Sequence, residues 1–239
     1  MDVAVVIVVF VAITAAIVLG VVAASHRRKQ WAEFAASRGW RHVHKDRHFF
    51  RGLKQEPFNR GGSRVAFNIV EGSFHGLPVR AFTYQYTTRN GENSTTHYHR
   101  VVQVPTPAVL PPLQVRSGWR LALTRDIQFE SDQFNKDFDV RSPDERFAFR
   151  VVHPRFMAAL LDGALGSYHY SIENGLFTLW KGGRLGLDQV DEMLGRLVHL
   201  IELVPNPVWA DAGMAPPAIH AGSGPGPVIE RYSITSTRG

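Results

Sequence analysis

The sequence contains no cysteine in its 239 residues, which excludes disulfide bonds and every zinc site built on thiolates. A bound metal would therefore need histidine or carboxylate ligands. The absence decides nothing about the cellular compartment, because exported bacterial proteins also often lack cysteine. With 44% hydrophobic residues, the chain is long and apolar enough for one domain with appendages.

The signature motifs of common enzyme classes are missing as well. The chain has no G-x-x-x-x-G-K-[ST] phosphate loop, and Gly72–Gly76 does not match the G-x-S-x-G pattern of serine hydrolases. The glycines of residues 222–226 follow no predicted strand, so they do not indicate a dinucleotide-binding turn. The sequence thus predicts no catalytic residue and no cofactor.

The chain opens with a stretch that has no charge, Val3–Ala24. As a helix, these residues would span about 33 Å, enough to cross a bilayer. A signal peptide would carry basic residues before a shorter apolar run, whereas here the basic residues of His26–Lys29 follow the run. We therefore predict a transmembrane helix over residues 1–25 of a single-pass protein, although Ala23–Ser25 also resembles a cleavage site.

Basic residues are concentrated directly after this helix. Residues 27–64 hold eleven Lys and Arg against three Asp and Glu, so they carry a net charge of +8 in a chain of net charge +6. The positive-inside rule then places the following domain in the cytoplasm, at the plasma membrane. We predict that Arg27, Arg28 and Lys29 contact anionic lipid headgroups. A domain outside the membrane is the alternative topology.

Nucleic acid is not a predicted partner, despite a sequence pI near 9.9. No zinc finger, basic zipper or RNA-binding aromatic motif accompanies the basic residues.

The remaining pattern predicts an α+β fold, an antiparallel sheet packed by two to three helices. We divide the chain into a transmembrane helix (1–25), a basic juxtamembrane segment with a short helix (26–62), an α+β domain (63–204) and a disordered tail rich in Pro, Gly and Ser (205–239).

Local patterns place the individual elements. The predicted strands cover residues 40–44, 64–70, 77–87, 97–104, 168–172 and 176–180. The last two enclose Asn174-Gly175, the signal of a type I′ hairpin turn. The predicted helices cover residues 31–37, a segment from Ser142 that Pro154 kinks or divides, and 188–204. Ser142 and Glu145 match a capping box at the start of that helical segment.

Two histidine pairs are the best candidates for chemistry. His97 and His99 lie two apart on a predicted strand, so both would point to one face and could share a metal. His42 and His44 have the same spacing, with His48 nearby. Neither pair belongs to a known metal-binding motif, so we predict no metal site. We expect His97 and His99 to begin a strand with their imidazoles facing water.

An acidic cluster is the second candidate. Between residues 125 and 146, seven acidic residues are interleaved with four basic ones. Paired carboxylates could serve acid–base catalysis or bind calcium. The interleaved charges instead favour a solvated or partner-facing surface.

Three segments resemble a family of uncharacterised, single-pass, membrane-anchored actinobacterial proteins: FTYQYTT (82–88), the stretch 126–157 and the Asn174-Gly175 hairpin. The resemblance covers roughly residues 1–204. It implies a tethered α+β domain and supplies no activity and no catalytic position.

These observations predict a membrane-anchored, non-enzymatic protein-interaction domain at the inner face of the plasma membrane. Its partners would be the bilayer, through the N-terminal helix, anionic lipid headgroups and a protein whose identity the sequence does not reveal. The alternative is a membrane-associated hydrolase or metal-dependent enzyme that uses the scattered histidines and acidic residues.

Overall fold

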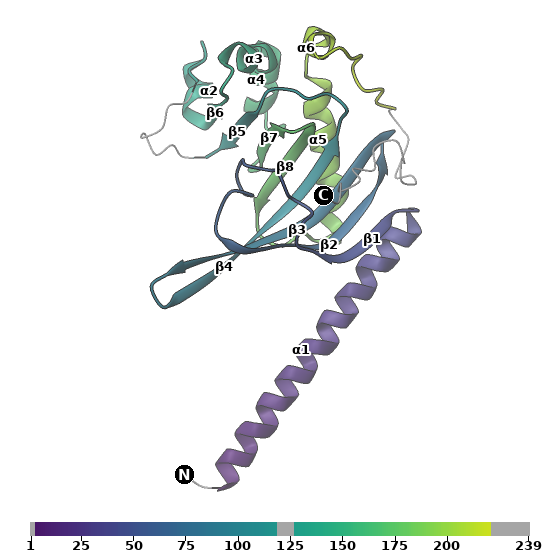
Figure 1. Cartoon of the computed structure of the whole chain (residues 1–239), viewed down its shortest axis with the longest axis vertical. Coiled ribbons are helices and arrows are strands. Elements are labelled where there is room, and N and C mark those ends of the chain that lie inside the picture. The colour runs from purple at the N-terminus through teal and green to yellow at the C-terminus, as the bar shows by residue number, and fades with distance from the viewer. Residues whose placement is uncertain (1–2, 119–126, 221–239) are drawn as a thin grey trace.

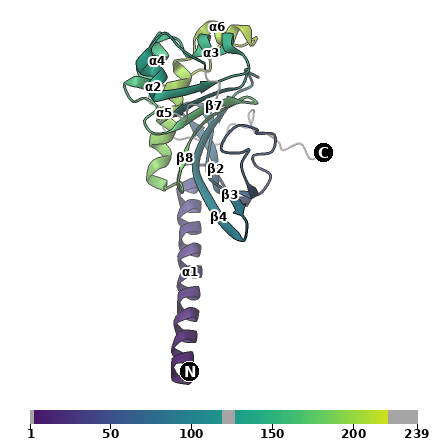
Figure 2. The ribbon, with the colours of Figure 1, turned by 90° about the vertical axis from the view of Figure 1, so that its left-hand side faces the viewer.

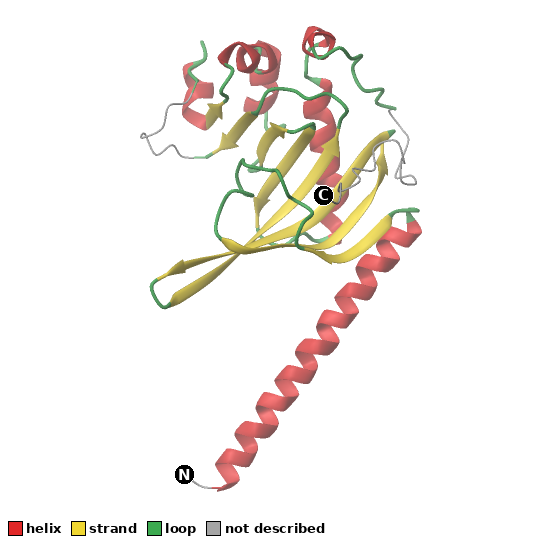
Figure 3. Ribbon diagram, in the orientation of Figure 1, coloured by secondary structure: helices red, strands yellow, loops and turns green. Residues whose placement is uncertain are grey.

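A computed structural model describes residues 3–118 and 127–220. The chain starts with one long helix, α1 (Val3–Ser37), which leads into a domain built on a single twisted sheet (Figure 1). The helix is followed by β1 (Arg41–Asp46), β2 (Gly62–Phe74), β3 (Leu77–Asn90), β4 (Asn93–Pro105), β5 (Leu113–Ser117), β6 (Phe138–Arg141), β7 (His169–Glu173) and β8 (Leu176–Gly182). Figure 3 shows how the strands and helices separate into layers.

All eight strands form one antiparallel sheet in the order β1-β2-β3-β4-β8-β7-β5-β6. The predicted α+β fold with an antiparallel sheet is therefore confirmed. The helices after α1 are α2 (Asp132–Asp137), α3 (Glu145–Val151), α4 (Pro154–Leu161), α5 (Val190–Glu202) and α6 (Asn206–Asp211), with a 3₁₀ turn η1 (Leu187–Gln189) before α5. These exceed the two to three helices that the sequence predicted, because several are only one or two turns long.

The short helix predicted at residues 31–37 is the last part of α1 rather than a separate element. No glycine or proline interrupts residues 21–38, so nothing ends the helix at the predicted membrane boundary. The helix ends at Ser37, and Gly39, two residues later, adopts the left-handed conformation with φ 68°. The N–H of Gly39 bonds to the Ala36 carbonyl and that of Trp40 to the Ala35 carbonyl, the pattern of a Schellman motif.

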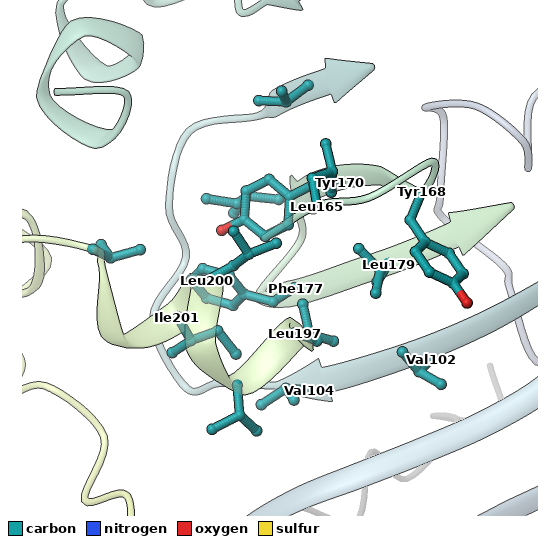
Figure 4. Packing of buried hydrophobic residues seen from close by; sticks show 14 of the residues in the cluster. Val102, Val104, Leu165, Tyr168, Tyr170, Phe177, Leu179, Leu197, Leu200 and Ile201 are labelled. Carbon is teal, nitrogen blue, oxygen red and sulfur yellow. The ribbon is translucent and has the colours of Figure 1, made fainter. Parts of the chain in front are cut away.

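The main core lies between one face of the sheet and the helices. Figure 4 shows Leu197, Leu200 and Ile201 of α5 lying against side chains from the sheet, among them Phe177 and Leu179 of β8. Leu197 and Ile201 belong to the repeat of apolar residues that predicted a helix over residues 188–204, so that helix is confirmed.

The β7–β8 hairpin forms where Asn174-Gly175 predicted it. Asn174 has φ 51° and Gly175 has φ 70°, as a type I′ turn requires. A side chain at Gly175 would also meet the Thr106 carbonyl oxygen at 2.8 Å. Backbone conformation and close packing therefore both favour glycine here.

Strand β2 departs from the simple alternation predicted for residues 64–70. Its register with β3 shifts between Phe67 and Val70, and Asn68 has φ 50°. The bulge adds a residue, so Ala66 and Ile69 face one side of the sheet and Val70 packs in the main core on the other. Alternation alone could not reveal this change of face.

The predicted capping box at Ser142 is wrong by two residues. Helix α3 begins at Glu145, and its N-cap is Asp144, whose carboxylate accepts a hydrogen bond from the N–H of Phe147. The Ser142 hydroxyl instead donates to the Pro112 carbonyl oxygen at 2.7 Å. Pro154 starts the new helix α4, one of the two outcomes that the sequence left open.

The disordered tail predicted from residue 205 is contradicted over its first part. Residues 206–211 form α6, and the Trp209 side chain is 1% exposed. Its ring packs on Phe177 at 5.6 Å between centroids, and its indole N–H donates to the Val204 carbonyl oxygen at 3.3 Å. Residues 221–239 of the predicted tail lie outside the described residues.

Candidate membrane interface and histidine cluster

Helix α1 is the one helix in the described residues that is long and apolar enough to cross a membrane. Its apolar side chains from Val5 to Val22 are exposed and pack on no other part of the domain. Arg27, Arg28 and Lys29 are exposed on the turns that follow. The 3.8 Å ion pair between Lys29 and Glu33 joins two highly exposed side chains, so it contributes little to stability.

The far end of α1 is built into the domain core. Trp31 and Ala35 are buried in the main core together with Trp40. The Arg38 guanidinium lies 4.0 Å from the Phe34 ring centroid and forms an ion pair with Asp191, at the start of α5. Helix α1 and the domain are therefore one packed unit, not two parts joined by a flexible linker.

Several of the basic residues after α1 remain exposed. Lys45, Arg47 and Arg51 are exposed in or just after β1, while Arg41 pairs with Glu71. Strand β1 is the edge strand of the sheet, and its first residue, Arg41, closely follows the end of α1. Lys45 and Arg47 lie at the other end of β1, and Arg51 precedes Gly52, whose carbonyl oxygen accepts a hydrogen bond from Asn174 of the β7–β8 turn at 2.9 Å. These basic residues therefore do not form one surface beside α1.

Both ring nitrogens of His99 are buried, so the expectation that its imidazole faces water is wrong, whereas His97 is half-buried. On one face of the sheet, the His99 ring stacks on Tyr86 at 5.5 Å and meets Trp180 edge-on at 5.4 Å. The His97 ring also stacks on Tyr86, at 4.8 Å, and its Nε2 lies 2.9 Å from the Thr88 hydroxyl. Aromatic rings from the neighbouring strands therefore pack against both imidazoles.

A third histidine joins the cluster from a distant part of the sequence. His169 of β7 lies beside Trp180 at 4.3 Å between ring centroids. Five buried polar atoms in the cluster have no hydrogen-bond partner among the described residues: the Tyr84 hydroxyl, both ring nitrogens of His99, Nδ1 of His169 and Nε1 of Trp180. Each such atom costs about 1–3 kcal/mol of folding free energy.

Burial controls the protonation of these histidines. It lowers the pKa of His99 to about 4, and the nearby His97 and His169 act in the same direction. Burial also lowers the pKa of His169 to about 4, with a further contribution from Arg116. Both imidazoles are therefore neutral at pH 7. Because no hydrogen bond within the described chain joins them to a carboxylate, the arrangement lacks the base-orienting partner of a catalytic triad.

The four-histidine metal site considered from the sequence does not form. Strands β2 and β3 separate β1, which carries His42 and His44, from β4, which carries His97 and His99. Three strand spacings are about 14 Å, too far for shared ligands. Within residues 3–118 and 127–220, no three His, Asp or Glu side chains are grouped so that they could hold a metal. His48 lies in the connection after β1, where its backbone N–H donates to Asp46.

The β1–β2 connection, residues 47–61, covers the same face of the sheet as the cluster. Phe50 and Phe58 pack edge-on against Tyr84, with ring centroids at 5.0 and 4.9 Å. Glu173 holds this connection in place, because its carboxylate accepts the backbone N–H groups of Lys54 and Gln55 at 2.7 and 3.0 Å. Figure 2 shows the connection and α5 on opposite faces of the sheet. The sequence placed these residues in the predicted juxtamembrane segment (26–62) and did not reveal their buried aromatic side chains.

An ion network closes one side of this connection. Glu56 pairs with Arg60 and Arg116, and Arg116 also pairs with Asp139. Burial alone would raise the pKa of the Glu56 carboxyl, but its hydrogen bonds and charge pairs with Arg60 and Arg116 lower that pKa. Glu56 is therefore ionised and engaged with arginines at pH 7, unlike a general acid, whose pKa is raised.

The acidic cluster has structural roles where the structure describes it. Asp139 is buried and pairs with Arg116 and Arg141, so it does not belong to a solvated surface. Asp144 caps α3, and Asp137 accepts a hydrogen bond from Gln133 at 2.6 Å. Asp126 lies outside the described residues. The structure thus brings no two of these described carboxylates together as a catalytic pair.

Two open clefts lie at the end of the domain that carries α2 and α3. One, of about 620 Å³, is lined mainly by polar residues that include Lys54, Gln114 and Arg141. The other, of about 330 Å³, lies between the Val109–Pro111 segment and α3 and α6. Val109 is 81% exposed, and Phe149, on α3, is 47% exposed. No histidine of the cluster lines either cleft.

Comparison with known proteins adds a likeness of fold. No family model matches the chain, and no curated protein matches it. The crystal structure of the mycobacterial trehalose monomycolate transport factor A, TtfA, superposes with a TM-score of 0.53 and 19% sequence identity. The match covers 76% of this chain and 96% of that one. The likeness shows a shared fold with a protein of an actinobacterium, the group to which the family resemblance also pointed.

Proposed function

We propose that this protein is a membrane-anchored, non-enzymatic factor. In this proposal its domain is held at the cytoplasmic face of the plasma membrane and binds a protein partner there. The observation that carries the proposal is the unbroken α1, whose first part is exposed and apolar and whose last turns are buried in the domain core. Such a helix holds the whole domain at the bilayer surface.

The orientation is proposed from charge. Arg27, Arg28 and Lys29 directly follow the apolar part of α1 and are exposed, so they can remain in the cytoplasm and contact anionic headgroups. An activity reporter fused after Gly239 tests this orientation. It should be active only in the cytoplasm. Replacing the three residues by glutamine should give a mixture of the two orientations. If the reporter fused to the wild-type protein is active only outside the cytoplasm, the proposed topology is wrong.

The non-enzymatic role is proposed from the candidate chemistry. His99 and His169 have no hydrogen bond to a carboxylate among the described residues, Glu56 and Asp139 are engaged with arginines, and Asp144 caps a helix. The fold shared with a protein named as a transport factor supports an accessory role. By that analogy we propose a role in the movement of an amphiphilic glycolipid by a membrane partner.

Photo-crosslinking in the native host tests the partner. A crosslinkable residue at Val109, which is highly exposed, and a second at Arg51, which is also exposed, sample two positions on the surface of the domain. We expect a reproducible protein adduct from at least one position. The matched control carries α1 fused to an unrelated soluble domain and should lose that adduct. Recovery of lipid adducts alone would refute partner binding.

Metal analysis of the purified chain, together with the variants His97→Ala and His99→Ala, separates this proposal from the enzyme alternative. We expect no stoichiometric metal. Stoichiometric metal lost in both variants would support a metal-dependent enzyme instead.

A further inference from the structure

The β3–β4 hairpin extends beyond the rest of the sheet. Strand β2 pairs with β3 as far as Thr87, and β8 pairs with β4 only from His99 onward. Beyond these points β3 and β4 pair only with each other, as far as Asn90 and Asn93, and Gly91 has the positive φ, 60°, that the turn requires. We call Arg89–Thr96 the hairpin tip, and every residue in it is exposed.

The tip points to the side of the domain from which α1 leaves. In Figure 1 the hairpin projects below the sheet, toward the membrane-spanning part of α1, and Figure 2 shows the same from the perpendicular direction. Helices α2, α3 and α4 lie at the opposite end in both views. Because α1 is packed into the core through Trp31 and Ala35, this direction is fixed relative to the helix.

The hairpin is long enough to reach the bilayer surface. From Ala24, the last residue of the apolar run, to Trp31, the first buried core residue, α1 rises about 10 Å. From Thr87, the last residue paired with β2, to Gly91, the hairpin extends about 13 Å. The hairpin projects from the side of the domain that α1 leaves, and its length exceeds the distance along α1 between the domain core and the apolar run. It can therefore reach the headgroups.

The chemistry of the tip suits headgroups rather than hydrocarbon or a protein groove. Its sequence, RNGENSTT, is entirely polar and contains one arginine and one glutamate. Arginine and side-chain hydroxyl and amide groups hydrogen-bond phosphates and sugar hydroxyls. A protein interface would need aromatic or large apolar residues at its centre, and the tip has none.

We propose that the hairpin tip rests on the lipid headgroups of the leaflet that adjoins the domain. It makes a second membrane contact beside α1, and two contacts fix which face of the domain is turned toward the bilayer. The proposal rests on the membrane-spanning role of α1 proposed above. It does not depend on the protein partner or on the side of the membrane.

Fluorescence quenching in lipid vesicles tests this contact. Because the chain has no cysteine, Glu92→Cys in the full chain gives one labelling site at the turn. The matched control is Ala158→Cys, exposed on α4 at the far end of the domain. Both proteins are reconstituted into phosphatidylglycerol-containing vesicles with a quencher on the lipid headgroup, and flotation with the vesicles is measured on the same samples.

We expect the fluorophore at position 92 to be quenched clearly more than the one at position 158. Adding Arg89→Gln should lower the equilibrium constant for the hairpin contact by about fivefold, the effect expected for the loss of one basic residue at an anionic surface. If the protein floats with the vesicles but both positions are quenched equally, the hairpin contact is wrong while the anchor stands. The tip would then be available to a protein partner. Protein that does not float would overturn the anchor, and the hairpin contact with it.

Discussion

Trp209 offers a sharp test of where the folded domain ends, because the surrounding sequence is typical of a disordered tail. Its side chain is 1% exposed and packs on Phe177. A buried tryptophan removes about 200 Å² from water, which corresponds to about 5 kcal/mol at 25 cal/mol per Å². Trp209→Ala should therefore lower the free energy of unfolding by about 3–5 kcal/mol.

At about 2–4 °C per kcal/mol for a domain of roughly 150–250 residues, the Trp209→Ala unfolding midpoint should fall by about 6–20 °C. Calorimetry of the full chain in detergent measures this shift. The control on the same helix is Asp211→Ala, which removes an exposed ion pair with Arg150 and should cost less than about 1 kcal/mol. If both variants have the same unfolding midpoint as the wild-type protein, α6 does not belong to the cooperatively folded domain.

Three further predictions follow from the packing and the charges. Gly72→Ala would place its Cβ 2.1 Å from Trp40 Cδ1, so it should displace that ring and destabilise the domain by about 1–3 kcal/mol in urea unfolding. The free energy of unfolding should fall as the pH is lowered from about 6.5 to about 4, because the unfolded chain binds protons on His99 and His169 that the folded chain does not bind. His99→Phe should make the free energy of unfolding depend less on pH in acid titrations followed by circular dichroism. Tyr84→Phe, which removes a buried hydroxyl without a partner among the described residues, should leave the urea midpoint unchanged or raise it, and a loss above about 1 kcal/mol would show that the hydroxyl is hydrogen-bonded.

The sequence predicted best where a few neighbouring residues determine the structure. Asn174-Gly175 specifies its own turn, because few other pairs tolerate two consecutive residues with positive φ. Pro154 excludes an unbroken helix for a similarly local reason. The apolar stripe of α5 repeats over several turns, which fixes both the element and its buried face.

The histidine cluster could not be predicted in the same way. His99, His169 and Trp180 meet only because β4 pairs with β8 and β8 with β7. That strand order depends on contacts across about eighty residues of sequence, and no local pattern encodes it. The aromatic residues at 82, 84 and 86 did indicate that this face of the strand is buried, because a strand with large rings on one face needs another segment to pack on them.

Two predictions from the sequence, the N-cap at Ser142 and the disordered tail from residue 205, are wrong for the same physical reason, a single contact with a distant part of the chain. Ser142 has the composition of an N-cap, but its hydroxyl bonds to Pro112, thirty residues earlier, and Asp144 takes over the cap. Trp209 is one aromatic residue among prolines, glycines and alanines, and its partner Phe177 is distant in sequence. In both cases one tertiary contact outweighs a reasonable local preference.

The junction at the end of α1 links these observations to function. A domain that searched freely for partners would need a flexible linker after its membrane segment, whereas α1 continues without a break into Trp31, Ala35 and the Schellman motif at Gly39. If α1 is the proposed anchor, it determines orientation as well as location. In the proposed arrangement, with the hairpin side toward the bilayer, the surfaces left for a protein partner are the sides of the domain and the end formed by α2, α3 and α4 (Figure 1). That end carries Val109, Phe149 and both clefts, so crosslinking at Val109 samples it directly.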